Sequence, residues 1–383
     1  MTLASTRRIG AIALAATMFV AACGSSGATT APTDQSAASM APEPSSGAMS
    51  APEPGSASLV LQGAGATFPA PLYQVWFEKY TELHGNIQFD YQAIGSGGGI
   101  KAITEQTVDF GASDAAMKDS EISALPAGVT LLHVPTALGA VVVIFNIPGV
   151  TDLNLDADAV AGLFLGTITN WNDAKIAALN PGVALPDLAV TVVHRSDGSG
   201  TTNAFTTYLD TVSPDWHAGP GAGKEVDWPV GIGAPGNDGV AGGVKQTDGT
   251  VGYVELNYAA QAGLTSAKVK NADGQFVAGS TAGVTAAAEA AASSFPADFR
   301  QAPIINGAGP STYPIASYTY LLIPVDWTDA DKAQAMVAFT YWALTDGQSE
   351  ENALGYAPLP APIQQRAIDE LHKVTANGSA VWP

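Results

Sequence analysis

The chain has 383 residues, with 15 basic and 35 acidic side chains and a formal net charge of −20 at pH 7. This length exceeds one ordinary hydrophobic core, so two folded lobes are expected once a leading segment is set aside. A field of that sign repels polyphosphate backbones, so nucleic acid is excluded as a partner. One cysteine and five scattered histidines give no zinc or iron–sulfur spacing, and no metal or other cofactor is expected.

Residues 1–22 have the pattern of a signal peptide. Arg7 and Arg8 precede an apolar stretch over residues 9–22, and small residues stand directly before Cys23. The stretch is shorter than the ~20 apolar residues that span a bilayer. The pattern resembles a bacterial lipoprotein signal in which Cys23 carries the lipid; the alternative is a cleaved secretory peptide with an incidental cysteine.

Residues 23–58 are predicted to form a tether. The segment consists mainly of Ala, Ser, Pro, Gly and Thr, and the sequence Ala-Pro-Glu-Pro occurs twice in it, beginning at Ala41 and at Ala51. Such a composition cannot build a packed core, so we expect a solvated chain with a reach of roughly 30 Å. That reach would let a folded body face a membrane partner.

From Leu59 onward, strand patterns alternate with helix patterns. Strands are predicted over residues 87–94, 108–113, 138–147 and 188–194, with helical stretches between them. This alternation is typical of the α/β class. The continuous apolar run over residues 140–145 suits a strand that is covered on both faces, as in mostly parallel sheets. Ligands of such sheets collect at the carboxyl ends of the strands.

Two stretches look like elaborations on a second lobe. Residues 215–248 are rich in glycine and poor in periodic apolar residues. Residues 282–293 predict an alanine-rich helix that is followed by a proline-bearing loop.

The first candidate site segment is the turn around Thr67. Residues 63–71 precede an amphipathic helix start at Leu72, with prolines where a first helical turn allows them. The Thr67 hydroxyl and nearby N–H groups would then face a ligand. The alternative is that Thr67 only caps the helix.

The second candidate segment is the glycine-rich turn that contains Ser96. It follows a predicted strand and opens a helix over residues 101–105, so a ligand could approach the backbone closely while Ser96 donates through its hydroxyl. The turn matches neither a dinucleotide fingerprint nor a Walker loop. A tight structural turn is the alternative.

Asp114 stands at the carboxyl end of the strand predicted over residues 108–113. A carboxylate beside a bound anion is understandable if the ligand carries a proton. Asp114 can then accept a hydrogen bond from a P–OH group, whereas a fully ionised oxyanion offers only repulsion. The alternative is a helix cap or a solvated turn residue.

The run over residues 194–201 is the most informative in the chain. It places a cation, an acidic residue and several hydroxyls before an apolar helical pattern at residues 204–209. Backbone N–H groups at a helix start are unpaired and bind oxyanions. Arg195 could donate two parallel hydrogen bonds, with Asp197 orienting its guanidinium. The alternatives are a surface ion pair for Arg195 and a plain N-cap for Ser199.

These segments together carry a family resemblance. The chain resembles, in order and spacing, the phosphate-binding protein of the bacterial phosphate ABC importer, a class II periplasmic-binding-protein family, at residues 63–73, 91–100, 108–114 and 195–202. Residues 250–255 and 355–360 are similar to that family as well. The resemblance therefore covers nearly everything from Leu59 to the C-terminus, and the tether falls outside it.

The resemblance implies a set of phosphate ligands, and each position holds the residue type of the family. These are Thr67, Phe68, Ser96, Asp114, Arg195, Ser199, Gly200 and Thr201, with Asp197 behind Arg195. Residues 219–243 do not align with the family pattern, so the resemblance assigns no contact there.

The resemblance also implies a fold. Two α/β lobes would be joined by two crossing strands and close on the ligand like a Venus flytrap. The crossings are expected near residues 135–138 and 314–318. Lobe 1 would comprise residues 59–137 and 313–383, and lobe 2 residues 138–312.

The function implied is high-affinity binding of inorganic phosphate outside the cytoplasmic membrane and delivery to the permease subunits of an ABC importer. Acylation of Cys23, with palmitate among the lipids, would anchor the protein at the extracytoplasmic face of the cell membrane. A monomer suffices for one ligand and one transporter face.

Two rival functions remain open from the residues themselves. A phosphatase or phosphotransferase would hold phosphate as a product, but the sequence shows no metal cluster, and Ser199 lacks the outer glycines of a nucleophile elbow. The second rival is a receptor for another tetrahedral or organic anion, against which Asp114 favours phosphate. The expectation is a binding protein and not an enzyme.

Overall fold

The computed structural model describes residues 50–383. The predicted signal peptide, the predicted lipid site at Cys23 and residues 23–49 of the predicted tether lie outside the described residues. In the part that is described, no helix combines the length and the apolar character that a membrane crossing needs.

A mixed sheet runs through residues 50–383, with the strand order β2-β1-β3-β13-β4-β8-β6-β7. The strands at either end, β2-β1-β3 and β8-β6-β7, are parallel to one another, whereas β13 and β4 run antiparallel to their neighbours. The bounds are β1 (Leu59–Gly65), β2 (Ile87–Ala93), β3 (Phe110–Ser113), β4 (Leu131–Asn146), β6 (Thr191–Arg195), β7 (Ile232–Ala234), β8 (Thr250–Glu255) and β13 (Ile315–Pro324), with β9 (Thr265–Ser266) and β12 (Ile304–Ile305) paired at the side.

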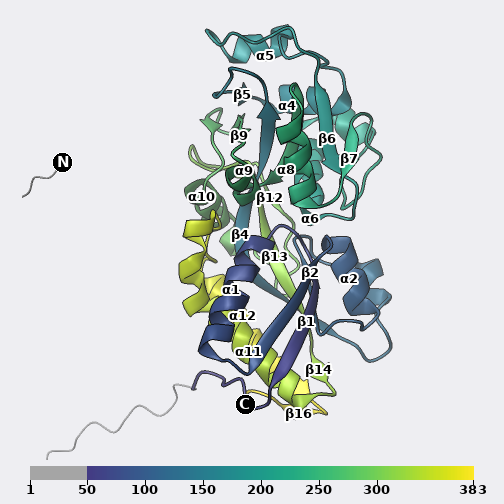
Figure 1. Cartoon of the computed structure of the whole chain (residues 1–383), viewed down its shortest axis with the longest axis vertical. Coiled ribbons are helices and arrows are strands. Elements are labelled where there is room, and N and C mark those ends of the chain that lie inside the picture. The colour runs from purple at the N-terminus through teal and green to yellow at the C-terminus, as the bar shows by residue number, and fades with distance from the viewer. Residues whose placement is uncertain (1–49) are drawn as a thin grey trace, which may run out of the picture. The chain divides into compact units, whose positions relative to one another are not determined.

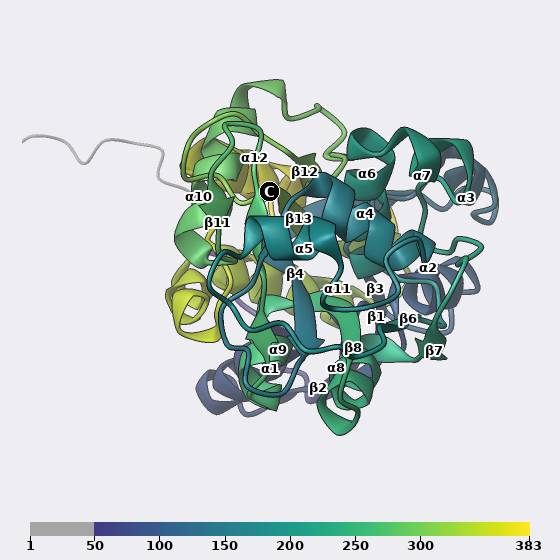
Figure 2. The ribbon, with the colours of Figure 1, turned by 90° about the horizontal axis from the view of Figure 1, so that it is seen from above.

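Helices cover both faces of this sheet. In Figure 1, helices α1 (Ala70–Leu83), α2 (Ser96–Thr104), α11 (Ala330–Leu344) and α12 (Ala361–Glu370) surround the half that contains β1 and β2. The other half carries α4 (Ala157–Leu165), α6 (Gly200–Val212), α8 (Gly236–Gln246), α9 (Leu256–Ala262) and α10 (Thr281–Ala291). Figure 2 shows α4 and α6 on one side of the central strands, with α8 and α9 on the other.

The remaining elements are short. They are α3 (Asp119–Ser123), α5 (Ala174–Leu179), α7 (Pro214–Ala218), β5 (Asn154–Leu155), β10 (Lys268–Lys270), β11 (Phe276–Val277), β14 (Asp326–Trp327), β15 (Thr375–Ala376) and β16 (Ser379–Ala380).

Strands β4 and β13 connect the two halves (Figure 1). β4 pairs with β13 over residues 131–140 and with β8 over residues 141–146, so one continuous strand belongs to both halves. The β4–β13 register shifts between Thr319 and Tyr320, which leaves Thr136 as the extra residue. Such a bulge bends and twists a strand locally. The two-lobed α/β fold with two crossing strands is confirmed.

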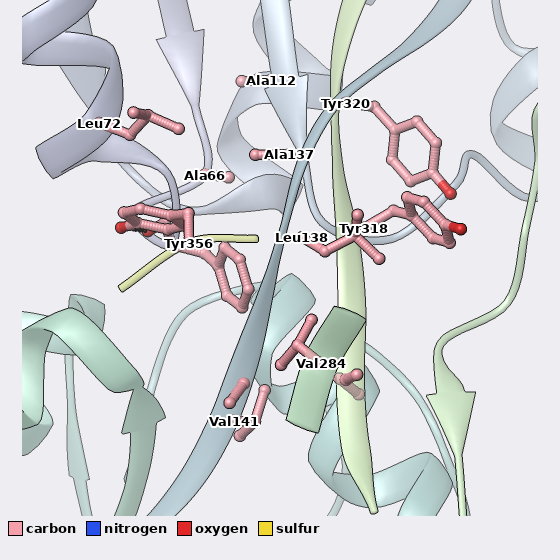
Figure 3. Packing of buried hydrophobic residues seen from close by; sticks show 14 of the residues in the cluster. Ala66, Leu72, Ala112, Ala137, Leu138, Val141, Val284, Tyr318, Tyr320 and Tyr356 are labelled. Carbon is pink, nitrogen blue, oxygen red and sulfur yellow. Dashed lines mark hydrogen bonds between the residues drawn. The ribbon is translucent and has the colours of Figure 1, made fainter. Parts of the chain in front are cut away.

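Buried apolar side chains pack around the crossing. Leu138 and Tyr318 are paired residues of β4 and β13, and Figure 3 shows them between Ala112 of the first half and Val141 of the second. All four belong to one cluster of buried residues that extends through both halves. The crossing strands therefore set where the loops of the two halves meet.

The surroundings of the apolar run at residues 140–145 differ from the prediction. The run is buried, as expected, but β4 lies antiparallel to both β13 and β8, so the expectation of a mostly parallel sheet is wrong for this strand. Helices α8, α9, α10 and α12 all contact β4. Cover by helices, and not strand direction, explains the unbroken apolar run.

The last residues of the predicted tether also differ, because residues 50–58 pack on the folded body. The Asn86 side-chain amide donates to the carbonyls of Gly55 and Ala57, at 3.2 and 2.9 Å. The indole N–H of Trp382 donates to the Ser50 carbonyl at 3.1 Å, and Pro54 is buried. Carbonyls of an extended Pro- and Gly-rich chain are free to accept such bonds, but the donors lie far away in the sequence.

The glycine-rich stretch over residues 215–248 is more regular than its composition indicates. It contains most of α7, strand β7 and helix α8. The sequence pattern does not reveal helix α8, because only Val240, Ala241 and Val244 supply its buried apolar face.

Candidate functional site

The predicted site residues meet where the loops after β1, β2, β3 and β6 converge. Three of these loops lead into α1, α2 and α6, and no acidic residue lies in the first turn of any of these helices. The same holds for α5, α9, α10 and α12, whereas α3, α4, α7, α8 and α11 each have an acidic residue there. The positive ends of the three helix dipoles at the site are therefore not neutralised from within.

Ser96 joins three of these loops. Its Oγ accepts hydrogen bonds from the N–H groups of Asp114, at 3.2 Å, and Gly200, at 3.1 Å. Its hydroxyl donates to Oδ2 of Asp114 at 3.4 Å. A Cβ on Gly200 would lie only 2.5 Å from the Cβ of Asp114. Glycine at position 200 therefore allows the two halves to come together at this point.

Asp114 is a buried carboxyl group. The residue is 3% exposed. The hydroxyl of Thr319 donates a hydrogen bond to its Oδ1 at 2.8 Å. Burial raises the pKa of Asp114 to about 7, although the Thr319 hydrogen bond, the Arg195 charge and Ser96 oppose that shift. The structure thus favours neither a solvated turn residue nor a helix cap at this position.

This raised pKa should make the stability of the ligand-free protein depend on pH. The ordinary pKa of 3.8 holds in the unfolded chain and about 7 in the folded one, so the folded state binds the proton more tightly. Stability that is present at acidic pH is then lost as the pH rises through this interval. We expect Asp114→Asn to raise the free energy of unfolding near pH 8 by up to about 4 kcal/mol, and to change it little near pH 4.

Urea unfolding of phosphate-free protein at both pH values measures this difference. Asp90→Asn, at an exposed position of β2, is the matched control and should leave the pH dependence of the parent unchanged. If the free energies of unfolding of the parent and of Asp114→Asn differ by the same amount at every pH from 4 to 8, the raised pKa of Asp114 is contradicted.

Arg195 is held by Asp197 and is almost completely buried, at 4% exposed. Its Nε and Nη2 donate to the two carboxylate oxygens of Asp197, at 2.7 and 2.5 Å. Burial alone would raise the pKa of Asp197, but the Arg195 guanidinium and the Gly236 N–H bring it below its ordinary value. The pair stays ionised, and the position is not that of a surface ion pair.

The third nitrogen of this guanidinium has no partner among residues 50–383. Nη1 of Arg195 is buried and makes no hydrogen bond there. A buried charged donor without an acceptor is costly, and such groups are normally paired. Within residues 50–383, the guanidinium thus offers one edge to Asp197 and leaves the Nη1 edge without an acceptor.

Gly95 allows the β2–α2 loop to approach this ion pair. Its φ is +86°, and a Cβ there would lie 2.2 Å from Oδ2 of Asp197. Glycine is favoured for both reasons. The adjoining Gly97 N–H donates to the Gly198 carbonyl at 2.8 Å, which ties the loop before α2 to the loop before α6.

The threonine and serine hydroxyls have different partners. Ser199 accepts from the Thr202 N–H at 3.0 Å, so it does cap α6. Thr67 does not cap α1, whose N-cap is Pro69. Instead, Thr67 Oγ1 and Thr201 Oγ1 both accept from the side-chain amide of Asn237, at 2.9 and 3.1 Å.

Phe68 is placed by its packing and its carbonyl. The ring is buried, and the Tyr356 hydroxyl donates to the Phe68 carbonyl at 2.7 Å. The eight expected ligand positions are therefore gathered at one place, and Asp197 lies behind Arg195.

Two polar residues at this place were missed by the sequence reasoning. Asn237 lies in the segment that did not align with the family pattern. Thr319 lies on β13, and with Ser317 it forms a polar pair at strand spacing within a buried apolar strand. Because residues two apart share one face of a strand, that pair was a usable signal. Asn237 offered no comparable signal.

A cavity of about 710 Å³ lies beside the cluster. Arg195 and Asp197 line it together with His194, Lys224 and Trp228, whereas Ser96, Asp114 and Thr67 do not. These three side chains are sealed within the cluster, so the Arg195–Asp197 pair lies between the cavity and the sealed residues.

Comparison with known proteins defines the class. Residues 27–346 match the model of the PBP superfamily domain. A crystal structure of the phosphate binding protein from Stenotrophomonas maltophilia has a similar fold, with a TM-score of 0.66 at 22% identity, covering 83% of this chain and 96% of that one.

Curated relatives define the family more closely. The phosphate-binding protein PstS of Xylella fastidiosa is 42% identical over 305 residues, which cover 79% of this chain and 82% of that protein. PstS of Pasteurella multocida is 40% identical over 326 residues, which cover 84% and 93%. This chain belongs to the PstS phosphate-binding proteins of the PBP superfamily, which confirms the resemblance seen in the sequence.

Proposed function

We propose that this protein binds inorganic phosphate in the buried cluster around Arg195 and Asp114 and delivers it to an ABC importer permease. The observation that carries the proposal is the Nη1 of Arg195, which is buried and has no partner among residues 50–383, in the same cluster as the buried Asp114 carboxyl group. A tetrahedral oxyanion that carries one proton satisfies both groups at once. The relatives named PstS are phosphate-binding proteins, which supports the same ligand.

The proposed ligands provide a forked cation, hydroxyls and backbone N–H groups. They are Thr67, Phe68, Ser96, Asp114, Arg195, Ser199, Gly200 and Thr201. Micromolar affinity requires about 8 kcal/mol, and hydrogen bonds to charged groups contribute roughly 1.5 to 3 kcal/mol each. Five or six such donors suffice, so a protein of net charge −20 can still bind an anion.

Asp114 would select phosphate by sharing one proton with it. Near neutral pH phosphate brings a proton, which the ionised carboxylate accepts as a hydrogen bond. Sulfate brings none, so its binding requires Asp114 to take up a proton from solution. Because the pKa of Asp114 is raised to about 7, that uptake becomes harder as the pH rises above neutrality.

The proposal extends to the place of the protein in the cell. The pattern before Cys23 supports a lipid anchor there, palmitate included, at the extracytoplasmic face of the membrane, with residues 24–49 as the tether. We assign lobe 1 to residues 59–137 and 313–383 and lobe 2 to residues 138–312, and add residues 50–58 to lobe 1 because of their contacts with Asn86 and Trp382.

Binding without catalysis is part of the same proposal. The family is one of substrate-binding transport proteins, and no nucleophile–base pair is assigned to the cluster. A monomer fits one ligand and one transporter face. Failure to hydrolyse a generic phosphomonoester is the expected result of an activity assay.

Calorimetric titration of a soluble fragment that begins at Ser50 tests the binding function. Bound ligand is first removed by unfolding and refolding, and phosphate and sulfate are then compared at one pH. Tight phosphate binding with no sulfate signal is expected. No heat with either anion would reject the proposal.

A further inference from the structure

Asn237 is the buried hub of the cluster, although no site residue was expected from its segment. It lies in the first turn of α8 and has no exposed surface. Its N–H and its side-chain amide both donate to Thr67 Oγ1, at 3.2 and 2.9 Å, and the amide also donates to Thr201 Oγ1 at 3.1 Å. Thr67 precedes α1 in one half, whereas Thr201 and Asn237 belong to the other.

The direction of these hydrogen bonds follows from chemistry. The Glu255 N–H can only donate, and it donates to Oδ1 of Asn237 at 3.0 Å. The other terminal atom of Asn237 is therefore the NH₂ group, which cannot accept. The Asn237 backbone N–H cannot accept either. Both threonine oxygens must accept from Asn237.

A hydroxyl that accepts must use its hydrogen elsewhere. Thr67 Oγ1 accepts two hydrogen bonds, which fill both of its lone pairs, so it can interact further only as a donor. Within residues 50–383, neither Thr67 nor Thr201 makes a hydrogen bond through its hydroxyl hydrogen, although both side chains are buried. A buried donor without an acceptor is unfavourable, so we infer that a bound ligand supplies the acceptors for both hydroxyl hydrogens.

Ser96 is held in only a partly similar way. Its oxygen accepts from the N–H groups of Asp114 and Gly200, but its hydroxyl hydrogen already has a partner, because it donates to Oδ2 of Asp114 at 3.4 Å. Within residues 50–383, Thr67 and Thr201 therefore differ from Ser96 in keeping an unused hydroxyl hydrogen, and Asn237 orients both of them.

We propose that Asn237 is a positioning residue that fixes the hydroxyls of Thr67 and Thr201 as hydrogen-bond donors to the bound oxyanion. It acts through these two threonines and does not touch the anion. The inference rests on the proposed function, and it adds a rule for ligand orientation. Oxygens that face Thr67 and Thr201 must be unprotonated acceptors, which leaves Asp114 as the place for the ligand proton.

A mere bridge between the two halves would not need this arrangement. Interlobe contact is already supplied by Ser96 with Gly200 and by Gly97 with Gly198. A bridge would also work with the threonines donating to the protein. Asn237 donates two hydrogen bonds to one threonine oxygen, which forces the hydroxyl of Thr67 to donate outward. A bridge between the halves does not require that orientation, but a donor to a ligand does.

A double-mutant cycle tests the inference. Asn237→Leu removes the amide at similar volume, and Thr67→Val with Thr201→Val removes the two hydroxyls. We expect Asn237→Leu to weaken phosphate binding about 10-fold or more in the parent, but less than about 3-fold in the double-valine background. An equal loss in both backgrounds would mean that Asn237 acts through the fold alone and would overturn the inference.

The controls separate this inference from the proposed function. Asn180→Leu removes another buried asparagine, one that bonds to Asn154 and the Ile176 carbonyl, and it should leave phosphate affinity unchanged. A parent that binds no phosphate would reject the proposed function itself. A parent that binds phosphate, with equal losses in both backgrounds of the cycle, would reject only the role of Asn237.

Neutron diffraction of the phosphate-bound parent, exchanged into D₂O, gives a second test that needs no variant to fold. The deuterons of the Thr67 and Thr201 hydroxyls should point to phosphate oxygens. A phosphate deuteron that points to either threonine oxygen, or a threonine deuteron that points to the protein, would overturn the inference.

Discussion

Replacement of Arg195 by alanine is expected to weaken phosphate binding by at least about 100-fold. The variant loses the only side-chain cation among the proposed ligands, whose buried Nη1 has no partner in the described part of the chain. It also leaves the Asp197 carboxylate beside the anion without its ion-pair partner. Both effects act against an oxyanion in a buried site, where charges are poorly screened.

Calorimetry at one pH and salt concentration measures this loss. Lys79→Ala removes the same charge at an exposed position, where Lys79 pairs with Glu350, and should leave phosphate affinity unchanged. Arg195→Lys keeps the charge but not the planar fork, so an intermediate affinity is expected. An Arg195→Ala variant that retains affinity within tenfold of the parent would show that the arginine only packs or caps.

The second large effect concerns selectivity. Near pH 8 the parent should reject sulfate strongly, because a site built around a ligand hydroxyl can discriminate by up to about 10⁴. Asp114→Asn replaces an acceptor that repels an unprotonated oxygen with an amide that can donate to it. We expect the phosphate-to-sulfate affinity ratio to fall by at least about 100-fold in this variant.

The ratio must be measured with both anions on each protein, since Asp114→Asn is also expected to weaken phosphate. For the parent, sulfate affinity should decrease as the pH rises above about 7, because proton uptake by Asp114 becomes unfavourable. The variant should show no such decrease. Equal phosphate-to-sulfate affinity ratios in parent and variant would show that Asp114 does not determine the selectivity.

The candidate site was predictable where its residues form short local motifs. Ser96, Asp114 and Arg195 each stand directly at a strand end or helix start, and the chemistry of such turns is legible from a few neighbouring residues. The family resemblance then added their shared ligand. Thr67 is different, because the local pattern suggested a cap, while the structure gives it a partner 170 positions away.

The parts that could not be predicted depend on contacts between distant segments. Asn237 has neighbours at positions 67, 201 and 255, and its meaning appears only when α8 is packed against β8. The docking of residues 50–58 on Asn86 and Trp382 is of the same kind. The composition of residues 50–58 predicts an extended chain, but it does not predict which part of the protein surface that chain contacts.

Strand β4 shows a similar limit within one element. Its apolar second part was predicted from residue 138, but the strand begins at Leu131. His133, Pro135 and Thr136 interrupt the apolar pattern, yet all three are buried, because β13 pairs alongside and Thr136 bonds to Tyr73. Tertiary pairing here outweighs local preference.

A crystal structure of the stripped protein soaked with phosphate tests the central claim most directly. We predict one phosphate within hydrogen-bond distance of Arg195 Nη1, with one of its oxygens against the Asp114 carboxyl group and others against the hydroxyls of Thr67 and Thr201. A phosphate bound only in the neighbouring cavity lined by His194 and Trp228, with Arg195 Nη1 still unpaired, would contradict the account.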